Sequence, residues 1–450
     1  MRRAEMGYAS TRASTRGQAP VSLDRALVEG IAADGGLYLP LGLPAFVPGD
    51  FAAAASLGDV ARILLAPFFG GSTLEPALAD IVDETFRFPV PETPLPGGRR
   101  SLLELFHGPT AAFKDVGAGF LAACLARLEG DAADPLTVLV ATSGDTGGAV
   151  AAAFDGRPGM RVVVLFPDGR VSERQARQLT CWGDNVLSLC VAGTFDDCQA
   201  IVKAALGDAG LARRYRFSSA NSINIGRLLP QATYYADASL RHFRARGERP
   251  GFIIPTGNLG NALACLLAKE MGLPIGPVVL ATNANRTIPD YLATRRWEPR
   301  ASVATLASAM DVGNPSNMER LRVLLGDADE LAGKLDVVAV DDASIRHEIR
   351  AAWEEFGFAI CPHTATASRA WRELPPAAKD GAHWIIVATA HPAKFETIVE
   401  PLIGTTVPVP PELAAILSRP SRSVRIDATP DAFAAALDDA FGGRGSRAAP

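Results

Sequence analysis

Short apolar runs alternate with helix-patterned segments through most of the chain, and this alternation restricts the possible folds more than any other feature. The apolar runs predict strands at residues 136–141, 161–166, 186–191, 251–255, 278–282, 337–340 and 384–389. Helical patterns lie between them, at residues 171–180, 196–206, 227–243, 261–271 and 343–356. Buried strands joined through helices are typical of βαβ crossovers and mainly parallel sheets. The expected fold class is therefore α/β.

The rest of the chain suggests where domains begin and end. Helices broken by Gly/Pro turns are expected at 23–33, 59–67 and 74–86, and a proline-dense stretch at 89–98 indicates a boundary. The predicted division is a mostly helical N-terminal domain at 1–95, a small α/β domain at 96–218, a large cofactor-binding α/β domain at 219–405, and a C-terminal helix and tail at 406–450.

Composition excludes several classes of protein. Of the 450 residues 48% are hydrophobic and 21% charged, which excludes whole-chain disorder. The net charge of −5 argues against a nucleic-acid partner bound by bulk electrostatics. No apolar run approaches the roughly 18 residues of a membrane helix, so no membrane partner is expected. The six cysteines form no C-x-x-C pair, and residues 1–20 lack an apolar signal core, so we expect reduced thiols and a cytoplasmic location.

One lysine is placed where amine chemistry is favoured. The chain has few lysines: Lys114, Lys203, Lys269, Lys334, Lys379 and Lys394. Lys114 lies between Phe113 and a run of small residues, where its amine can be desolvated, as a Schiff-base lysine requires. The alternative is a lysine at a helix start that pairs with Asp115. The neighbouring pattern Gly117-x-Gly119-x-x-Ala122 resembles a dinucleotide fingerprint, but the expected preceding strand is missing.

Two strand–loop–helix segments are suited to binding anions. In the first, at 138–148, backbone N–H groups and the hydroxyls of Thr142, Ser143 and Thr146 can surround a phosphate or carboxylate, although an ordinary βα turn explains it as well. The second, at 252–261, contains Gly257, Asn258, Leu259, Gly260 and Asn261. Two such loops and an unusual lysine together suggest a phosphorylated cofactor and an anionic substrate.

Further polar residues interrupt apolar surroundings. Asn224 and Arg227 precede a helix, and Thr389 ends an apolar strand, at the carboxyl edge where α/β sites open. His363 and His391 have no neighbours typical of a metal site or a catalytic triad, so both are expected to be hydrogen-bonded structural histidines. No metal site is predicted.

Several ordered motifs together resemble the threonine synthase family of pyridoxal-phosphate enzymes, fold type II. They are Ser-Thr-Arg-Gly near the start, Asp-Gly-Gly-Leu-Tyr at 34–38, Phe-His-Gly-Pro-Thr-x-x-Phe-Lys-Asp at 106–115, Thr-Ser-Gly-Asp-Thr-Gly at 142–147, Asn-Ser-Ile-Asn at 221–224, Pro-Thr-Gly-Asn-Leu-Gly-Asn at 255–261 and Ala-Thr-Ala-His-Pro-Ala-Lys-Phe at 388–395. The resemblance implies two open, mainly parallel twisted sheets flanked by helices. The family pattern Tyr-x-Ser-Thr-Arg-Gly is interrupted here by four residues, so either Ser-Thr-Arg copy can take that position.

The resemblance also implies a role for each site residue. Lys114 matches the Schiff-base lysine, the segment Gly257-Asn258-Leu259-Gly260-Asn261 matches the cofactor-phosphate loop, and Thr389 matches the partner of the pyridine nitrogen. Ser143, Asp145 and Thr146 match the loop that meets the substrate carboxylate and the ring hydroxyl, although many relatives carry Asn at the position of Asp145. Asn224 and Arg227 are candidates for the substrate phosphate.

The implied reaction converts O-phospho-L-homoserine and water into L-threonine and phosphate, carried out by a monomer or a homodimer. One rival is a phospho-lyase paralogue that releases 2-oxobutyrate, and another is a catalytically idle protein that holds pyridoxal phosphate. Lys394 is the main competitor of Lys114 for the Schiff base. Because Lys394 is close to Thr389 in sequence, we expect it at the ring-nitrogen end, far from the aldehyde.

Overall fold

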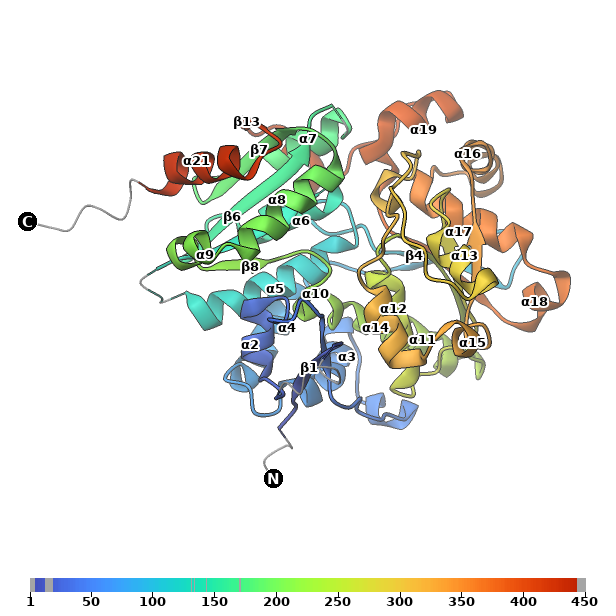
Figure 1. Ribbon diagram of the computed structural model, residues 1–450. Helices are drawn as coiled ribbons and strands as arrows, with labels where there is room; N and C mark the ends of the chain where they lie inside the picture. Colours follow the sequence, from blue (N-terminus) through green and yellow to red (C-terminus); the bar gives the residue numbers. More distant parts are fainter. Residues whose placement is uncertain are drawn as a thin grey trace, which may run out of the picture.

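The computed structural model describes residues 5–12, 19–130, 132, 134–142, 144–169 and 171–442. Two larger sheets lie side by side, one at the left and one at the right of Figure 1. The five-stranded sheet has the order β13-β7-β6-β5-β8, and the six-stranded sheet the order β11-β10-β9-β12-β4-β3. All neighbouring strands in these two sheets are parallel except the pair β3–β4. The predicted α/β class with mainly parallel sheets is confirmed.

The strands are short, and those at the sheet centres are almost wholly apolar. The five-stranded sheet contains β5 (Leu136–Ala141), β6 (Met160–Pro167), β7 (Val186–Ala192), β8 (Phe217–Ser219) and β13 (Val424–Asp427). The six-stranded sheet contains β3 (Glu92–Pro94), β4 (Arg100–Glu104), β9 (Gly251–Pro255), β10 (Val278–Thr282), β11 (Asp336–Ala339) and β12 (Trp384–Ala388). Every residue of β5, β9, β10 and β12 is buried, as expected for strands covered on both faces.

Helices cover both sheets. Helix α17 (Pro362–Glu373) packs on β9, β10 and β12. Helix α12 (Gly260–Glu270) contacts β9 and also packs against α11 (Gln231–Arg246). The remaining helices near the six-stranded sheet are α13 (Thr287–Thr294), α14 (Met318–Leu325), α15 (Ala328–Leu331), α16 (Asp342–Phe356), α18 (Pro376–Gly381) and α19 (Glu396–Ile403). On the five-stranded sheet, α6 (Asp145–Phe154) and α8 (Phe195–Gly207) contact β5 and β6. Around them lie α7 (Glu173–Thr180), α9 (Ala209–Tyr215), α20 (Pro411–Leu417) and α21 (Pro430–Phe441).

Helices α5 (Lys114–Glu129) and α10 (Ile225–Leu228) join the two halves near the centre of the molecule (Figure 1). Helix α5 packs on α6, while α10 contacts both α5 and α12. A Cβ at Gly117 would lie 2.8 Å from the carbonyl oxygen of Arg227, so this glycine permits the close approach of α5 to α10. Residues 105–113 separate α5 from β4, so the fingerprint-like glycines do not follow a strand directly.

The N-terminal region is helical and carries a two-stranded sheet. It contains α2 (Leu23–Glu29), α3 (Leu57–Leu65), α4 (Leu78–Thr85) and the antiparallel strands β1 (Tyr8–Ser10) and β2 (Tyr38–Pro40). The predicted helix 23–33 ends early because Gly30, at φ +70°, caps it. The predicted helix 74–86 is divided, because a 3₁₀ turn at Glu75–Ala77 with a proline precedes α4.

The sheets do not follow the predicted domain boundaries. Strand β4, assigned from the sequence to the small domain at 96–218, pairs with β12 in the six-stranded sheet. Strand β13, from the segment predicted as helix and tail, pairs with β7 in the five-stranded sheet. Only Ile426 of β13 is buried, so this edge strand lacks the apolar run by which the inner strands were predicted.

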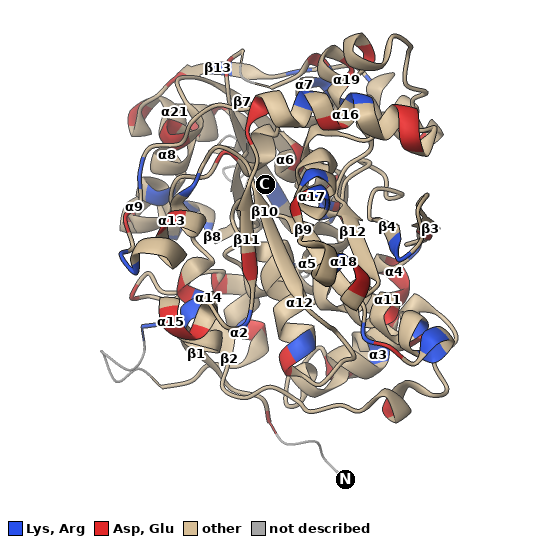
Figure 2. Ribbon diagram, turned by 90° about the vertical axis from the view of Figure 1, so that its right-hand side faces the viewer, with Lys and Arg blue, Asp and Glu red and all other residues tan. Residues whose placement is uncertain are grey.

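Charged residues lie mainly on the outer helices, with both signs interspersed, whereas β9, β10 and β12 are uncharged (Figure 2). This separation follows from the cost of burying an unpaired charge. Within the described ranges, no helix combines the length and apolarity needed to cross a membrane.

Candidate active site

A short loop places Lys114 beside the carboxyl end of β12. The N–H of Phe113 donates to the carbonyl of Thr389 over 2.9 Å, and the N–H of His391 donates to the carbonyl of Ala111 over 3.0 Å. Ala111 has a φ of +54°, an uncommon conformation that turns the loop toward α5. These two backbone contacts fix Lys114, the first residue of α5, next to Thr389.

A cavity of about 130 Å³ opens at this point. It is bounded where β5, β9 and β12 end, by Thr142, Thr256 and Thr389 respectively. The other predicted residues that line it are Lys114, Asp145, Thr146, Arg227, Gly257, Asn258, Leu259, Gly260 and Asn261. Ser143 falls outside the described residues. The structure thus collects residues from three distant loops at the carboxyl edges of both sheets, as the rule for α/β sites requires.

Lys114 is nearly buried and faces a carboxylate. Its side chain is 13% exposed, and its Nζ lies 3.8 Å from Oδ2 of Asp145. Burial lowers the pKa of Lys114 to about 8, so a larger fraction of this amine is neutral near pH 7 than of an ordinary lysine. The alternative pairing with Asp115 is wrong, because that carboxylate accepts the N–H and hydroxyl of Thr110 over 3.0 and 2.6 Å.

The glycine loop ends at the N-terminus of α12 and is shaped to hold an anion. Leu259 has a φ of +64°, and α12 begins at the next residue. A Cβ at Gly257 would lie 2.7 Å from the Cα of Met310, so only glycine fits there. The side-chain Nδ2 of Asn261 is buried and makes no hydrogen bond to any described residue. Free N–H donors at a helix N-terminus are a phosphate site.

Asn258 braces this loop. Its Nδ2 donates to Oγ of Ser222 over 2.6 Å, and its Oδ1 accepts the N–H of Ser316 over 2.6 Å. Both ends of the amide are therefore engaged by the protein. The Asn258 side chain therefore supports the loop.

Sequence reasoning missed Arg320, a fully buried arginine behind the same loop. It donates to the carbonyls of Tyr38, Ser222 and Ile223 and to Oδ1 of Asn317. Asn317 in turn donates to the carbonyl of Asn258 over 3.0 Å. The one indication in the sequence was spacing, because Arg320 follows the polar Asn314-Pro-Ser-Asn317 segment by one helical turn on the buried side of α14.

The loop before α6 is held in shape by hydrogen bonds to the side chain of Thr142. Oγ1 of Thr142 accepts the N–H groups of Gly144 and Gly147, both at 2.9 Å, so the hydroxyl organises the helix start. Gly144 has a φ of +139°, which permits the sharp turn. Thr142 therefore supports the turn, as the alternative reading of this segment expected, while Asp145 and Thr146 line the cavity.

Of the two residues predicted for the substrate phosphate, Arg227 lines the cavity and Asn224 does not. Arg227 donates from Nη1 to the carbonyl of Ala220 over 2.5 Å, and its buried Nε has no hydrogen-bond partner among the described residues. Burial lowers the pKa of Arg227 to about 10, which leaves it charged. The expectation for Asn224 is corrected: its amide donates to the carbonyls of Leu27 and Ser219, and its Oδ1 caps α10.

Thr389 and the two histidines occupy different positions. Thr389 lines the cavity, and its hydroxyl makes no hydrogen bond to the rest of the described chain. His363 also lines it, but its Nε2 accepts the N–H of Ala309 over 3.1 Å, and burial lowers its pKa to about 4, so the ring is neutral. Nδ1 of His391 accepts the N–H of Ala393 and caps a 3₁₀ turn away from the cavity. Both histidines are hydrogen-bonded, as expected.

A second cavity of about 360 Å³ adjoins the first and shares six lining residues with it: Ala141, Gln199, Asn221, Asn258, Asn314 and Ser316. Arg12, from the first Ser-Thr-Arg copy, lines this cavity and pairs with Glu319. The second copy, at 14–16, lies outside the described residues.

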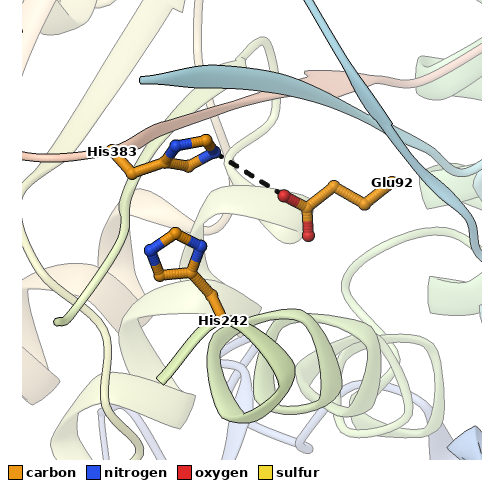
Figure 3. Close-up of side chains that lie close together, drawn as sticks. All are labelled: Glu92, His242 and His383. Atoms are coloured by element: carbon orange, nitrogen blue, oxygen red, sulfur yellow. Dashed lines mark ion pairs between the residues drawn. The ribbon is translucent and has the colours of Figure 1, made fainter. Parts of the chain in front are cut away.

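Glu92, His242 and His383 form a separate polar cluster (Figure 3). His383 directly precedes β12, so the cluster lies at the amino edge of the sheet, a strand length from Thr389. Ser101 bridges Glu92 and His383 at 2.6 and 2.9 Å, and His242 lies 3.3 Å from Glu248. The two rings stack with centroids 4.5 Å apart. Stacked faces do not direct two ring nitrogens at one ion, so we interpret the cluster as a hydrogen-bonded brace.

The sequence matches three family models. They are pyridoxal-phosphate dependent enzyme at residues 101–390, threonine synthase N terminus at 7–86 and threonine synthase, C-terminal, at 364–437. Threonine synthases of Serratia marcescens and Escherichia coli are both 40% identical to this chain, over 88% of it and 91% of each relative. The chain belongs to the threonine synthase family. Solved threonine synthases from Escherichia coli and Brucella melitensis, the latter with pyridoxal phosphate bound, superpose with TM-scores of 0.88 and 0.87 at 36% and 32% identity. They match 96% and 97% of this chain, and it covers 100% and 99% of theirs.

As a member of the threonine synthase family, the chain is a pyridoxal-phosphate-dependent enzyme. The residues present fit that cofactor. The unpartnered Nδ2 of Asn261 and the close approach at Gly257 form a cradle suited to a phosphate, and a desolvated amine and an unpaired hydroxyl lie on the same cavity. Lys114 and Thr389 supply those last two groups.

Proposed function

We propose that the enzyme converts O-phospho-L-homoserine and water into L-threonine and inorganic phosphate. The observation that carries this proposal is the single cavity in which Lys114, Arg227 and the glycine loop meet. The buried amine of Lys114 lines the same cavity as two groups of anion-binding donors. That arrangement suits a phosphorylated cofactor and a substrate that carries both a carboxylate and a phosphate.

In this proposal residues 257–261 and the N-terminus of α12 hold the cofactor phosphate, Thr389 meets the ring nitrogen, and Lys114 forms the covalent attachment. When bound, pyridoxal phosphate supplies an electron sink for negative charge that develops on the substrate carbon skeleton. The protein fixes the position of the reacting atoms, because the three attachment points come from α12, the end of β12 and the start of α5.

Proton transfer falls to the Lys114 amine. Its pKa of about 8 allows Nζ both to accept and to release a proton near neutral pH. Protons must leave Cα and Cβ of the substrate. After the phosphate has left Cγ, one proton must be added to Cγ to form the methyl group, water must add its hydroxyl to Cβ, and one proton must return to Cα. A single amine held on one side of the substrate can serve each transfer in turn, so no second acid or base is required.

The substrate's two anionic ends need separate partners. Thr146, on the first turn of α6, is proposed for the carboxylate together with Ser143, and the unpartnered Nε of buried Arg227 for the phosphate that leaves. Holding both ends restricts the rotation of the substrate and aligns the bond that breaks.

We place the enzyme in the cytoplasm. The six cysteines are all unpaired and five of them are buried, which suits a reducing compartment. A monomer or homodimer remains our expectation for its assembly.

The decisive experiment incubates purified holoenzyme with O-phospho-L-homoserine and quantifies phosphate, threonine and 2-oxobutyrate. Equal amounts of phosphate and threonine are expected. Phosphate with 2-oxobutyrate in place of threonine would identify the phospho-lyase alternative. A protein that binds the cofactor and releases no phosphate would be the idle alternative.

A further inference from the structure

A second lysine, Lys394, lies just behind the site and shares its carboxylate with Lys114. It belongs to the 3₁₀ turn Pro392–Phe395 and is completely buried. Its Nζ lies 2.8 Å from Oδ1 of Asp145 and donates to the carbonyl of Thr110 over 2.7 Å. Lys394 does not line the cavity. Its expected place at the ring-nitrogen end is corrected: the turn after Thr389 directs it back toward Asp145.

The two oxygens of Asp145 have different neighbours. Oδ1 accepts from Lys394 and, over 3.1 Å, from Nε2 of Gln175, so that oxygen is fixed by two donors. Oδ2 faces Lys114 at 3.8 Å, which is longer than a hydrogen bond. Asp145 is therefore bound tightly to Lys394 and only loosely to Lys114.

Charge balance follows from this geometry. When Lys394 is charged and Asp145 is ionised, the cluster of Lys114, Asp145 and Lys394 has no net charge only if the Lys114 amine is neutral. A proton on Lys114 leaves one uncompensated positive charge, which is costly in a buried site. If Lys394 carried no charge, Asp145 would need Lys114 as its counter-ion.

We propose that Lys394 is a positioning residue that neutralises Asp145 and thereby keeps the Lys114 amine available in its neutral form. Lys394 acts through Asp145 and touches neither substrate nor cofactor. The inference rests on the proposed role of Lys114, but it concerns the amine itself and can be measured without turnover.

The charges around the site agree with this inference. Burial by itself would raise the pKa of Asp145, but Lys394 and Lys114 outweigh that effect and hold the pKa below its ordinary range. For Lys114, burial lowers the pKa most, Asp145 opposes, and Lys394 and Arg227 lower it further. The other titratable groups near the site are Cys361, the N-cap of α17, His363 on the first turn of α17, and Asp115 on α5. Burial raises the pKa of the Cys361 thiol and lowers that of the His363 imidazole, so both stay neutral. Burial also raises the pKa of Asp115, to about 6, so this carboxyl is ionised over most of the pH range of the test.

The test measures the protonation of Lys114 in cofactor-free protein. Brief acetylation with acetic anhydride across pH 6–11, followed by peptide mass spectrometry, gives the pH midpoint of Lys114 reactivity. Lys394→Met should raise that midpoint by about one pH unit or more, and Asp145→Asn should lower it. The double variant Lys394→Met/Asp145→Asn removes both charges and should return it close to wild type.

Two controls separate charge from packing. Lys394→Arg keeps the charge and should leave the midpoint near wild type. Lys269→Met removes a lysine that donates to the carbonyl of Gly276, away from the site, and should change nothing. If the Lys394→Met variant fails to fold, the midpoint of the Asp145→Asn variant alone tests the inference.

A parallel readout uses the holoenzyme, whose bound-cofactor absorbance is titrated with pH in the same variants. Its midpoint should move in the same directions as the labelling midpoint. The inference is overturned if Lys394→Met leaves or lowers the Lys114 midpoint, or if the double variant behaves like Lys394→Met alone. If the labelling midpoints of the wild type and the variants are as expected but the wild-type holoenzyme forms no threonine, the result would instead count against the proposed function.

Discussion

At the scale of single residues, the site depends on groups that the protein leaves unsatisfied. The Lys114 amine is desolvated and loosely paired, the Nε of Arg227 and the Nδ2 of Asn261 are buried without partners, and the Thr389 hydroxyl has none among the described residues. Buried polar groups normally find partners, and exceptions call for an explanation. The explanation here is a bound ligand, because a phosphate, a carboxylate and a ring nitrogen would supply the missing hydrogen-bond partners.

Lys114→Ala should abolish covalent attachment of pyridoxal phosphate while leaving weaker, non-covalent binding through residues 257–261. Activity should fall by about 10³-fold or more, because the proton-transferring amine is lost with the attachment. Borohydride reduction of the wild type, digestion and peptide mapping identify the attached lysine. A pyridoxyl group on Lys394 or any other lysine would refute the assignment.

Thr389→Asp should give a folded, coloured protein with activity reduced about a hundredfold. A carboxylate at this position favours a protonated ring nitrogen, strengthens electron withdrawal from Cα, and changes how the reaction divides between products. Thr389→Ser keeps the hydroxyl and serves as the matched control. Steady-state assays of threonine and 2-oxobutyrate compare the two, and wild-type threonine formation by Thr389→Asp would remove Thr389 from the site.

At the scale of elements, helix starts and strand ends define the site. The N-terminus of α12 follows the end of β9, the N-terminus of α6 follows the end of β5, and α5 begins beside the end of β12. The backbone dipoles of α12 and α6 thus direct positive ends toward the same cavity. The site is built where the parallel strands stop.

Gly260→Asp should weaken binding of pyridoxal phosphate by about a hundredfold or more, because it places a carboxylate against the phosphate dianion. Gly260→Ala is the steric control. A Cβ there would meet Cβ of Ser222 at 3.4 Å and Nδ2 of Asn317 at 3.8 Å, both ordinary contacts. Equilibrium dialysis of apoprotein measures the affinities. Equal affinities for the two variants would place the phosphate elsewhere.

At the scale of the whole molecule, the C-terminal segment completes the five-stranded sheet. Strand β13 extends it beyond β7, and α21 packs on β13 and α8. Ile426, Phe433, Leu437 and Phe441 belong to the apolar cluster shared with β6 and α8. Residues near the end of the chain therefore stabilise the half of the molecule that carries Asp145.

Phe433→Ala should lower the free energy of unfolding by about 3–5 kcal/mol, because the ring is 1% exposed within that cluster. Val424→Ala, at a side chain 47% exposed on β13, should cost less than about 0.5 kcal/mol. Urea titration followed by circular dichroism compares the two. Equal stability of the two variants would mean that α21 does not contribute to the core.

Local patterns in the sequence were enough for the elements whose burial is uniform. The apolar runs at β5, β9, β10 and β12 predicted strands, since a strand buried on both faces must be apolar throughout. Likewise, the lysine, the two glycine-containing loops and Thr389 stood out because each is a polar interruption in an apolar context. Edge strands such as β13 and the short β8 have no comparable pattern and were not predicted.

The sequence by itself determined the α/β class, the family and the loops that reach the cavity, because strand burial, turn chemistry and motif order are local properties. Only the tertiary structure decided which polar groups remain available. Asn224 proved to be a helix cap, Thr142 a support of the turn before α6, Asn258 a brace of the glycine loop, and Lys394 the counter-ion of Asp145. Those roles depend on which groups from distant segments lie within hydrogen-bonding distance, and that is set by how strands pair and helices pack.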